Sequence, residues 1–300
     1  MGGAGPRVSI GLPVYNGENY VQEALDSILG QTYMDWELII CDNASTDGTA
    51  DICRKYAARD ARIHYHLNER NLGAAPNYNR TLELAVGEYF KWAAHDDLLA
   101  PQFLARCVEA LDQHPQAVLC HPKSRIIDER GQWIEDYDVH LRMDSPQPQV
   151  RFHDLIWVRH WCLQVFGLMR REKLLRTRLH GDYASADRVL LVELALLGPF
   201  CKVPEYLFFS RRHGRQASQL VYDLHSYARW FGPQGSEAVF PASRLAWEHF
   251  RAVRDAPIRP GQRARCYWSG LLRLGKFAGI LVKDVTVPLK RMWARERTSA

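Results

Sequence analysis

The sequence predicts an α/β protein with a mostly parallel, doubly wound sheet flanked by helices and followed by a C-terminal helical extension. Three observations support this fold class. Short apolar segments alternate with amphipathic ones through residues 8–114. Polar residues gather directly after the apolar segments, where ligands bind in such sheets. The segment after residue 250 is basic, with 12 Lys and Arg against 3 Asp and Glu, while the whole chain carries +5.

The first strand is expected over residues 8–12, and Pro13 is expected to end it. Residues 14–19 then form a polar loop with turn-forming residues. Apolar residues follow at helical spacing and predict a helix that ends near Gly30: Val21, Leu25, Ile28 and Leu29.

Three more strands are expected over residues 36–41, 63–67 and 89–94, each followed by a polar segment that opens a helix. Any one of these polar residues is also an ordinary turn or cap former. Four such loops at one edge of a sheet favour a ligand crevice. Its candidate residues are Asn16, Glu18, Asp42, Asp47, Asn71, Asp96 and Asp97.

The fourth strand ends in two adjacent carboxylates, Asp96 and Asp97. Paired carboxylates repel each other unless a cation or a proton lies between them. Mg²⁺ is typically held by one or two carboxylates together with substrate phosphates. The pair therefore predicts a divalent-metal site that receives a phosphorylated ligand. The alternative is an Asp cap for the helix expected from Pro101.

The middle of the chain continues the alternation. A helix is expected over residues 101–114, strands over 117–120 and 124–127, a turn at 129–131 and a mobile loop over 136–150. Trp157, Trp161 and Phe166 either stack on a sugar or, as is more common, belong to the core. A Leu-rich helix begins close to Asp187 and ends at Gly198. Strands at 200–204 and 207–210 precede a basic segment, and residues 219–250 are expected to be helical, with a break at Pro257 and Pro260.

Composition is ordinary for a globular protein, with 47% hydrophobic and 24% charged residues. Seven cysteines without a CxxC pair favour reduced thiols in the cytoplasm over disulfides or zinc. We expect neither a signal peptide nor a membrane span. Residues 267–283 mix Lys and Arg with Trp, Leu and Phe, which predicts a helix in the interface of an anionic membrane. The alternative is a helix that packs on the body with a basic outer face.

The polar segments, taken together and in this order, resemble the successive signatures of glycosyltransferase family 2. The matching segments are residues 13–18, 42–49, 71–73 with Asn77, and 96–97. The resemblance is close over residues 7–125 and looser to about residue 215. It implies a GT-A fold with a Rossmann-like sheet, and transfer of a sugar from a nucleotide diphosphate sugar with Mn²⁺ or Mg²⁺.

The resemblance also assigns residues. It implies a nucleotide-sugar site that includes Pro13, Tyr15, Glu18, Asp42 for the base, Asn71, Asp96 for the ribose and Arg212 for the diphosphate. It implies Asp97 as a metal ligand, His213 as a ligand of the metal or the diphosphate, and an acidic catalytic base; the alternative for Arg212 and His213 is a solvated loop. Of the acidic candidates Asp182, Asp187 and Glu193, we expect Asp187 to be the base, because the start of its helix would keep it ionised; the alternative is that Asp187 only caps the helix. The sequence departs from the family at Ala94, where a further Asp is common; for the adjacent His95 we favour a structural role.

These expectations give a domain plan and a function. Residues 1–135 would bind the donor, 136–250 would bind the acceptor within the same catalytic domain, and 251–300 would form a basic amphipathic tail. The expected activity is inverting, metal-dependent transfer to a saccharide or lipid-linked saccharide, in cell-surface polysaccharide or glycolipid synthesis at the inner face of the cell membrane. No nucleic-acid partner is expected.

Three alternatives stay open. A sugar-phosphate nucleotidyltransferase normally has a Gly-rich loop with Arg and Lys after the first strand, and residues 13–19 contain neither basic residue. A glycosidase holds its two carboxylates about 5 Å or more apart across the sugar, whereas Asp96 and Asp97 are adjacent. A non-catalytic sugar-nucleotide binder is suggested only by Ala94.

Overall fold

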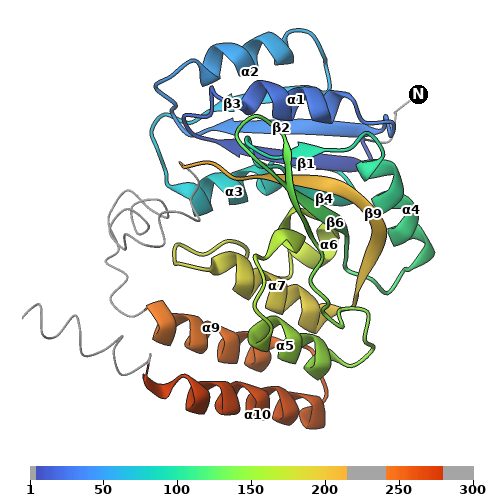
Figure 1. Ribbon diagram of the computed structural model, residues 1–300, viewed down its shortest axis with the longest axis vertical. Helices are drawn as coiled ribbons and strands as arrows, with labels where there is room; N and C mark the ends of the chain where they lie inside the picture. The colour runs from blue at the N-terminus through green and yellow to red at the C-terminus, as the bar shows by residue number, and fades with distance from the viewer. Residues whose placement is uncertain (1–4, 215–240, 280–300) are drawn as a thin grey trace, which may run out of the picture.

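The computed structural model describes residues 5–214 and 241–279. The described strands form one nine-stranded sheet with helices on both faces, and a layer of helices lies beyond one of these faces (Figure 1). The α/β class with a helical C-terminal part is therefore confirmed.

The first four strands pair in parallel, as the alternating pattern predicted: β1 (Val8–Val14), β2 (Trp36–Asp42), β3 (Ile63–Leu67) and β4 (Tyr89–Trp92), in the order β3-β2-β1-β4. The expectation that Pro13 ends β1 is wrong. The last residue of β1 that pairs with β4 is Gly11, so Pro13 lies where one side of the strand has no neighbour that needs its missing N–H.

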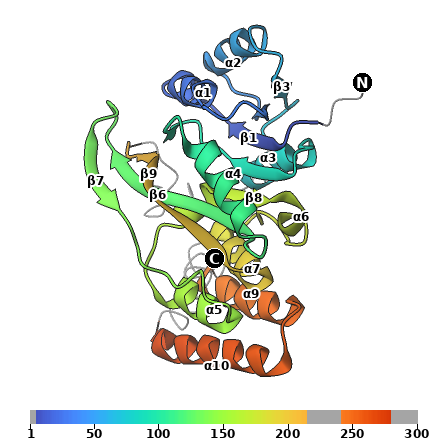
Figure 2. The same cartoon turned by 90° about the vertical axis from the view of Figure 1, so that its right-hand side faces the viewer.

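Beyond β4 the sheet is mixed. It adds β8 (Leu168–Arg170), β6 (Leu119–Ile127), β9 (Phe200–Arg211) and β5 (Leu98–Leu99) in that order, and β7 (Trp133–Tyr137) pairs with β6 (Figure 2). Of these contacts, β6 and β9 are parallel, and β4–β8, β6–β8, β6–β7 and β5–β9 are antiparallel.

In two places, two strands expected one after the other along the chain form a single long strand. Residues 117–120 and 124–127 contribute to one strand, β6, and 200–204 and 207–210 to another, β9. The breaks suggested by the sequence survive only as register shifts near Pro122 and Lys123. Residues 136–150 are not a free loop. They include the end of β7 and the start of α5 (Pro148–Trp157), and Arg142 pairs with Asp154 at 2.6 Å.

Every residue of β1, β2 and β4 is buried, because both faces of these strands are covered, whereas the edge strand β3 is partly exposed. Leu38 and Ile40 of β2 join the core beneath α1 (Val21–Leu29), α2 (Thr49–Ala57) and α4 (Phe103–Gln113). Ile39 and Cys41 face the opposite core, shared with α3 (Ala74–Glu83), α5 and α7 (Ala186–Leu197). Two shorter helices, η1 (Leu163–Phe166) and α6 (Arg171–Leu174), flank β8.

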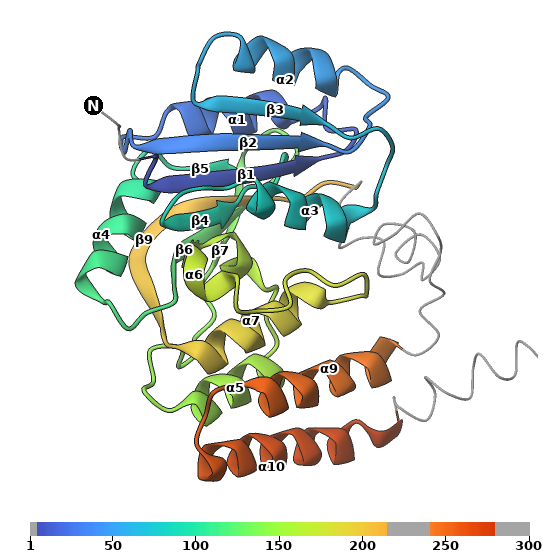
Figure 3. The same cartoon turned by 180° about the vertical axis from the view of Figure 1, so that it is seen from behind.

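The helical layer consists of α5, α7, α9 (Pro241–Asp255) and α10 (Pro260–Lys276), with α10 outermost (Figures 1 and 3). The expected break at Pro257 and Pro260 is confirmed. The helix expected over 219–250 lies outside the described residues before Pro241, as does the tail from residue 280. Among the described helices, none is both long and apolar enough to cross a membrane. All seven cysteines are free thiols.

Candidate functional site

The loops that follow β1–β4 form a polar rim, here called the carboxyl edge, which comprises residues 14–19, 42–49, 67–74 and 93–97. Its first two loops are hydrogen-bonded to each other. The Asn16 side chain accepts the Thr46 N–H at 2.8 Å, and the Asn16 N–H donates to Ser45 at 2.9 Å. Glu18 accepts the Gly48 N–H at 2.8 Å, so this predicted donor-site residue also holds the start of α2.

At Gly17, the backbone of the first loop packs closely against the side chains of His95 and Val14. A Cβ atom at Gly17 would lie 2.6 Å from the His95 ring and 2.8 Å from Val14. His95 therefore packs under the loop, which fits the structural role expected for it. Pro13 is buried beneath the rim, whereas Tyr15 is 45% exposed and its ring is open to a ligand.

Asp42 is fully buried at the end of β2. One carboxylate oxygen accepts the Ser45 N–H at 2.9 Å, and the other accepts the Tyr65 hydroxyl at 2.7 Å. The side chain thus stabilises the loop that follows it. Recognition of a nucleotide base by Asp42 stays a prediction.

A network of asparagine amides joins the second and third loops. Asn43 donates to Asn71 at 2.8 Å, and Asn68 donates to both Asn43 and Asn77 at 2.9 Å. Asn77 in turn donates to the carbonyl of Cys41 at 2.9 Å. Buried amides that satisfy one another fix their loops strongly. No local pattern in the sequence indicates the part played by Asn68.

The adjacent carboxylates have different partners. The His213 ring hydrogen-bonds to Asp96, with 2.9 Å between Nε2 and Oδ2, while Asp97 accepts the Arg211 N–H at 2.9 Å. Burial and the neighbouring Asp96 charge raise the pKa of Asp97 well above its ordinary value. Burial opposes ionisation of Asp96 as well, but His213 and His95 outweigh it and lower the pKa of Asp96. The structure therefore brings His213 to Asp96 rather than to Asp97.

Arg211 is the buried cation of the site, although the sequence had singled out its neighbour. The fully buried guanidinium donates to the Asp96 carbonyl at 2.9 Å and to the Glu129 carbonyl at 3.1 Å. It also pairs with Glu23 at 2.7 Å. Arg211 thus links the end of β9 to the carboxyl edge and to α1.

Arg212 points elsewhere. Its guanidinium pairs with Glu135 of β7 at 2.7 Å and lies 4.4 Å from the ring centre of Trp161. The Trp161 ring also stacks on Tyr137, with ring centres 4.6 Å apart, and Trp161 stays 44% exposed. Binding of a diphosphate by Arg212 stays a prediction.

Lys91 lies within the sheet close to the carboxylate pair. The side chain is fully buried, and its ammonium donates to the Trp92 carbonyl at 2.8 Å. Burial lowers the pKa of Lys91 to about 7, and the Asp97 charge opposes this shift. Lys91 therefore supplies a variable positive charge behind Asp97.

Among the described residues, no three His, Cys, Asp or Glu side chains are grouped to hold a metal ion. The chemistry of Asp96 and Asp97 still fits a hard divalent cation, because carboxylate oxygens are the ligands that Mg²⁺ and Mn²⁺ prefer. Burial is the main cause of the raised pKa of Asp97 and the Asp96 charge adds to it, so a cation between the two carboxylates would favour their ionised forms.

Asp187 lies in the first turn of α7, after Ser185 in the left-handed region at φ 63°. Its carboxylate accepts the Arg188 N–H at 2.8 Å. The helix start does not lower the pKa of Asp187, because burial dominates and raises it. A raised pKa brings a carboxylate closer to the range that a general base needs.

Tyr78 of α3 connects Asp187 to the carboxyl edge. Burial raises the pKa of Tyr78, and the charges of Asp96, Asp97 and Asp187 raise it further, so all three carboxylates act on one phenol. The His180 ring packs on Tyr78 with centres 4.9 Å apart. Sequence reasoning missed Tyr78 and His180, since only the fold brings α3 beside the loop before α7.

His180 is a buried imidazole without a hydrogen-bond partner at Nε2. Burial lowers the pKa of His180 to about 4, so the ring is neutral near pH 7. The backbone N–H of His180 donates to the Asn79 side chain of α3, and the backbone carbonyl of His180 accepts a hydrogen bond from the same side chain. These two hydrogen bonds fix the loop before α7 against α3. Of the other aromatic candidates, Trp157 donates to Ser269 at 3.1 Å and Phe166 packs on Phe208, as core residues do.

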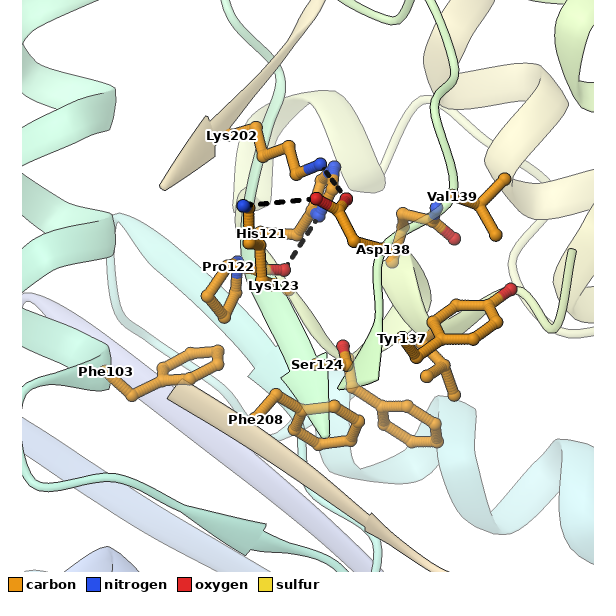
Figure 4. Close-up of a pocket in the computed structure, with 14 residues that line it drawn as sticks. Phe103, His121, Pro122, Lys123, Ser124, Tyr137, Asp138, Val139, Lys202 and Phe208 are labelled. Carbon is orange, nitrogen blue, oxygen red and sulfur yellow. Dashed lines mark hydrogen bonds and ion pairs between the residues drawn. The ribbon is translucent and has the colours of Figure 1, made fainter. Parts of the chain in front are cut away.

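A separate pocket lies between β6, β7 and β9 (Figure 4). Asp138 pairs there with Lys123 at 3.2 Å and with Lys202, beside His121, whose pKa burial lowers to about 4. The cavity measures about 20 Å³, room for a single water molecule. It is therefore no substrate site.

Relatives and solved structures resemble this chain. The Bacillus subtilis (strain 168) protein EpsE, provisionally named a glycosyltransferase, is 39% identical over 129 residues, 43% of this chain and 46% of EpsE. TuaG of the same strain, provisionally named a teichuronic acid biosynthesis glycosyltransferase, is 44% identical over 92 residues, 31% of this chain and 36% of TuaG. The chain thus matches less than half the length of these relatives.

Two solved structures have the same architecture. Staphylococcus aureus TarS 1-349 in complex with UDP-GlcNAc has a TM-score of 0.66 at 16% identity, over 90% of this chain and 73% of TarS 1-349. Mannosyltransferase PcManGT from Pyrobaculum calidifontis, in complex with GDP-Man and Mn²⁺, has a TM-score of 0.58 at 19% identity, over 97% and 83% of the two chains. The fold is therefore GT-A. The family model for glycosyl transferase family 2 matches residues 9–176, more than half of the sequence, and the chain belongs to that family.

Proposed function

We propose that this protein transfers a sugar from a nucleotide diphosphate sugar to an acceptor hydroxyl with inversion at the anomeric carbon. The observation that carries the proposal is the carboxyl edge, where hydrogen-bonded loops hold Asp42, Asp96 and Asp97 at the ends of β2 and β4. Asp187 of α7 is the candidate base. The nucleotide sugars bound in TarS and in the mannosyltransferase support this donor class.

The donor would lie on the carboxyl edge. Tyr15 offers an exposed ring, while Glu18, Asp42 and Asn71 hold the surrounding loops. A bound Mn²⁺ or Mg²⁺ would neutralise the charge that develops on the departing diphosphate. Asp97 and His213 were the ligands expected from the sequence. The contact between His213 and Asp96 favours Asp96 as the carboxylate that shares a cation with His213.

Asp187 would act as general base. In a single displacement, the acceptor hydroxyl attacks from the face opposite the diphosphate, and a base begins to take its proton. Asp187 belongs to α7, outside the carboxyl edge, and burial raises its pKa. Both properties suit a carboxylate that accepts a proton during turnover.

We also propose a saccharide or lipid-linked saccharide acceptor and contact with an anionic membrane. The biosynthetic name of TuaG supports a polysaccharide product. The outward face of α10 supports the membrane contact, because Trp268, Leu271 and Leu272 are each at least half exposed there. Flotation of the full chain with phosphatidylglycerol vesicles, and not with phosphatidylcholine vesicles, is the expected result.

A thermal-shift experiment tests the donor and metal assignments. We expect a nucleoside diphosphate with Mn²⁺ to raise the melting temperature more than either alone. A ligand at about 100 times its Kd stabilises by about 2.7 kcal/mol. Asp96→Asn should remove the metal-dependent part of the shift, whereas exposed Asp182→Asn should keep it. Equal shifts with and without Mn²⁺ would contradict a metal-dependent donor site, and donor hydrolysis that EDTA abolishes would exclude a non-catalytic binder.

A further inference from the structure

A cavity of about 250 Å³ lies between α5, α9 and α10, away from the carboxylates of the candidate active site. Apart from His249 and Arg273, its lining consists of Gly and apolar residues, including Phe152, Ile156, Leu245 and Leu274. An apolar cavity of about 150 Å³ is already large enough to bind benzene. Protein interiors rarely leave a void of this size, because unfilled volume destabilises the fold.

His249 marks the cavity as a binding site. The residue is 6% exposed, it lines the cavity, and its Nε2 has no hydrogen-bond partner among the residues that the structure describes. Buried polar atoms are nearly always hydrogen-bonded, so an unpartnered one calls for a missing partner. A polar atom in an otherwise apolar wall suits a ligand with a long hydrocarbon part and a few oxygen atoms.

The charge of Arg273 in the cavity lining indicates which class of ligand the cavity would bind. Among the described lining residues, Arg273 is the single charged one, and no ion pair joins it to another described residue. Its guanidinium lies 4.8 Å from the centre of the Phe277 ring, near the end of α10. A cation in an otherwise apolar lining, without a carboxylate partner in the described part of the chain, favours a ligand with an anionic head group.

The position of the cavity agrees with a membrane source. Its residues lie toward the start of α9 and the end of α10, the ends that face the same side of the molecule as the carboxyl ends of β1–β3 (Figure 3). Trp247 on α9 and Trp268, Leu271 and Leu272 on α10 are exposed apolar residues of the same two helices. A lipid drawn from the bilayer would therefore reach the cavity from the surface proposed to contact the membrane.

We propose that this cavity binds a hydrocarbon chain of an anionic membrane phospholipid, with its head group at Arg273 and an oxygen atom near His249. The site rests on the proposed membrane contact and goes beyond it, since it adds a specific lipid site to a general surface. It does not depend on the identity of the sugar donor.

Photolabelling of the full chain tests the site. The probe is phosphatidylglycerol with a diazirine in one acyl chain, diluted into phosphatidylcholine vesicles, and mass spectrometry locates the label. We expect label on the stretches 245–250 and 270–277. Ala246→Trp, which fills the cavity, should lower it at least ten-fold, and Ala264→Trp on the exposed face of α10 should not.

Charge is tested on the same helix. Arg273→Gln should lower labelling about ten-fold and remove the preference over a matched phosphatidylcholine probe, whereas exposed Arg265→Gln should retain both. Arg273→Gln decides the outcome if Ala246→Trp fails to fold. Label confined to the outer face near Trp268, no label, or label that survives both cavity variants would overturn the proposal. So would label that appears only after removal of residues 280–300, because the chain would then fill its own cavity.

The thermal shift with a nucleoside diphosphate and Mn²⁺ separates this proposal from the proposed function. Labelling without any shift would leave the lipid site standing and remove the donor assignment. A normal shift in the wild-type protein without labelling would remove the lipid site and leave the donor assignment.

Discussion

The carboxyl edge and the helical layer satisfy their polar groups in opposite ways. At the carboxyl edge, side chains such as Asn43, Asn68 and Asp42 bond to the loops around them. No buried side-chain atom of this edge lacks a partner in the described structure. In the helical layer, His249 is buried without a partner at Nε2 beside a cavity of about 250 Å³.

This difference indicates where the molecule is preorganised and where it is incomplete. Loops held by networks of buried hydrogen bonds keep their shape before a ligand arrives. An apolar cavity with an unpartnered polar atom gains more from a ligand, because the ligand fills volume and supplies a hydrogen bond. The donor edge should therefore be a stiff platform, and the helical layer should respond to what it binds.

Arg211→Met should cause the largest loss of stability, because it removes hydrogen bonds that hold the carboxyl edge. The buried guanidinium serves the carbonyls of Asp96 and Glu129, and these acceptors would be left without it. Its partner Glu23 is half exposed and contributes less. We expect a loss of about 3 kcal/mol in the free energy of unfolding, measured by urea denaturation.

Arg212→Met is the matched control. Its ion pair with Glu135 lies at the surface, where such pairs contribute about 0–1 kcal/mol. A cost for Arg212→Met that equals or exceeds the cost for Arg211→Met would contradict the assignment of Arg211 as the structural cation.

The same two arginines illustrate what the sequence can predict. Strands β1–β4 and their polar loops were predictable, since hydrophobic periodicity and turn residues are local signals. Which of two adjacent arginines is buried depends on how β9 pairs with β6 and β5, and no local pattern records that register. The same reason explains why β6 and β9 were each read as two strands.

The candidate site was predictable only in part. Motifs and helix positions indicated Asp96, Asp97 and Asp187 as candidates, but they did not indicate the hydrogen bond between His213 and Asp96 or the raised pKa of Asp187. Burial depends on residues far apart in the chain, such as Tyr78 of α3. The cavity near His249 was also beyond prediction, because it lies where three helices fail to fill the space between them.

Asp187→Asn should give the next largest effect. As loss of a general base, it should lower kcat by about 10² or more, equivalent to about 2.7 kcal/mol or more, and leave the thermal shift by donor and Mn²⁺ nearly unchanged. A base acts in its deprotonated form. Because burial raises the pKa of Asp187 in the free protein, the acidic limb of the kcat/KM profile should lie above the ordinary Asp value of 3.8.

The acidic limb should disappear in Asp187→Asn. Exposed Asp182→Asn should retain both turnover and the limb, since its side chain lies in solvent. If Asp182→Asn loses turnover and Asp187→Asn does not, Asp182 is the general base instead of Asp187. A product that keeps the anomeric configuration of the donor would exclude single displacement.

The smallest expected effect at neutral pH concerns His249 and the helical layer. Burial, aided by the charges of Arg188 and Arg273, lowers the pKa of His249 from 6.5 to about 3. The folded state therefore binds this proton less readily than the unfolded state. The resulting stability is complete above pH 6.5 and is lost progressively as the pH falls toward 3.

For each histidine of this kind, the free energy of unfolding changes by about 1.4 kcal/mol per pH unit between its pKa in the folded state and its pKa in the unfolded state. His249→Gln should remove one such slope between about pH 6 and pH 4, because glutamine does not titrate. His121, His160 and His180, each with a pKa lowered by burial to about 4, should keep the remaining dependence. Urea denaturation across this range measures the difference. An unchanged slope would mean that His249 is protonated in the folded state, which would place an acidic partner or water inside the cavity. That result would also contradict the difference between the carboxyl edge, whose buried polar atoms have hydrogen-bond partners, and the helical layer, where His249 has none at Nε2 among the described residues.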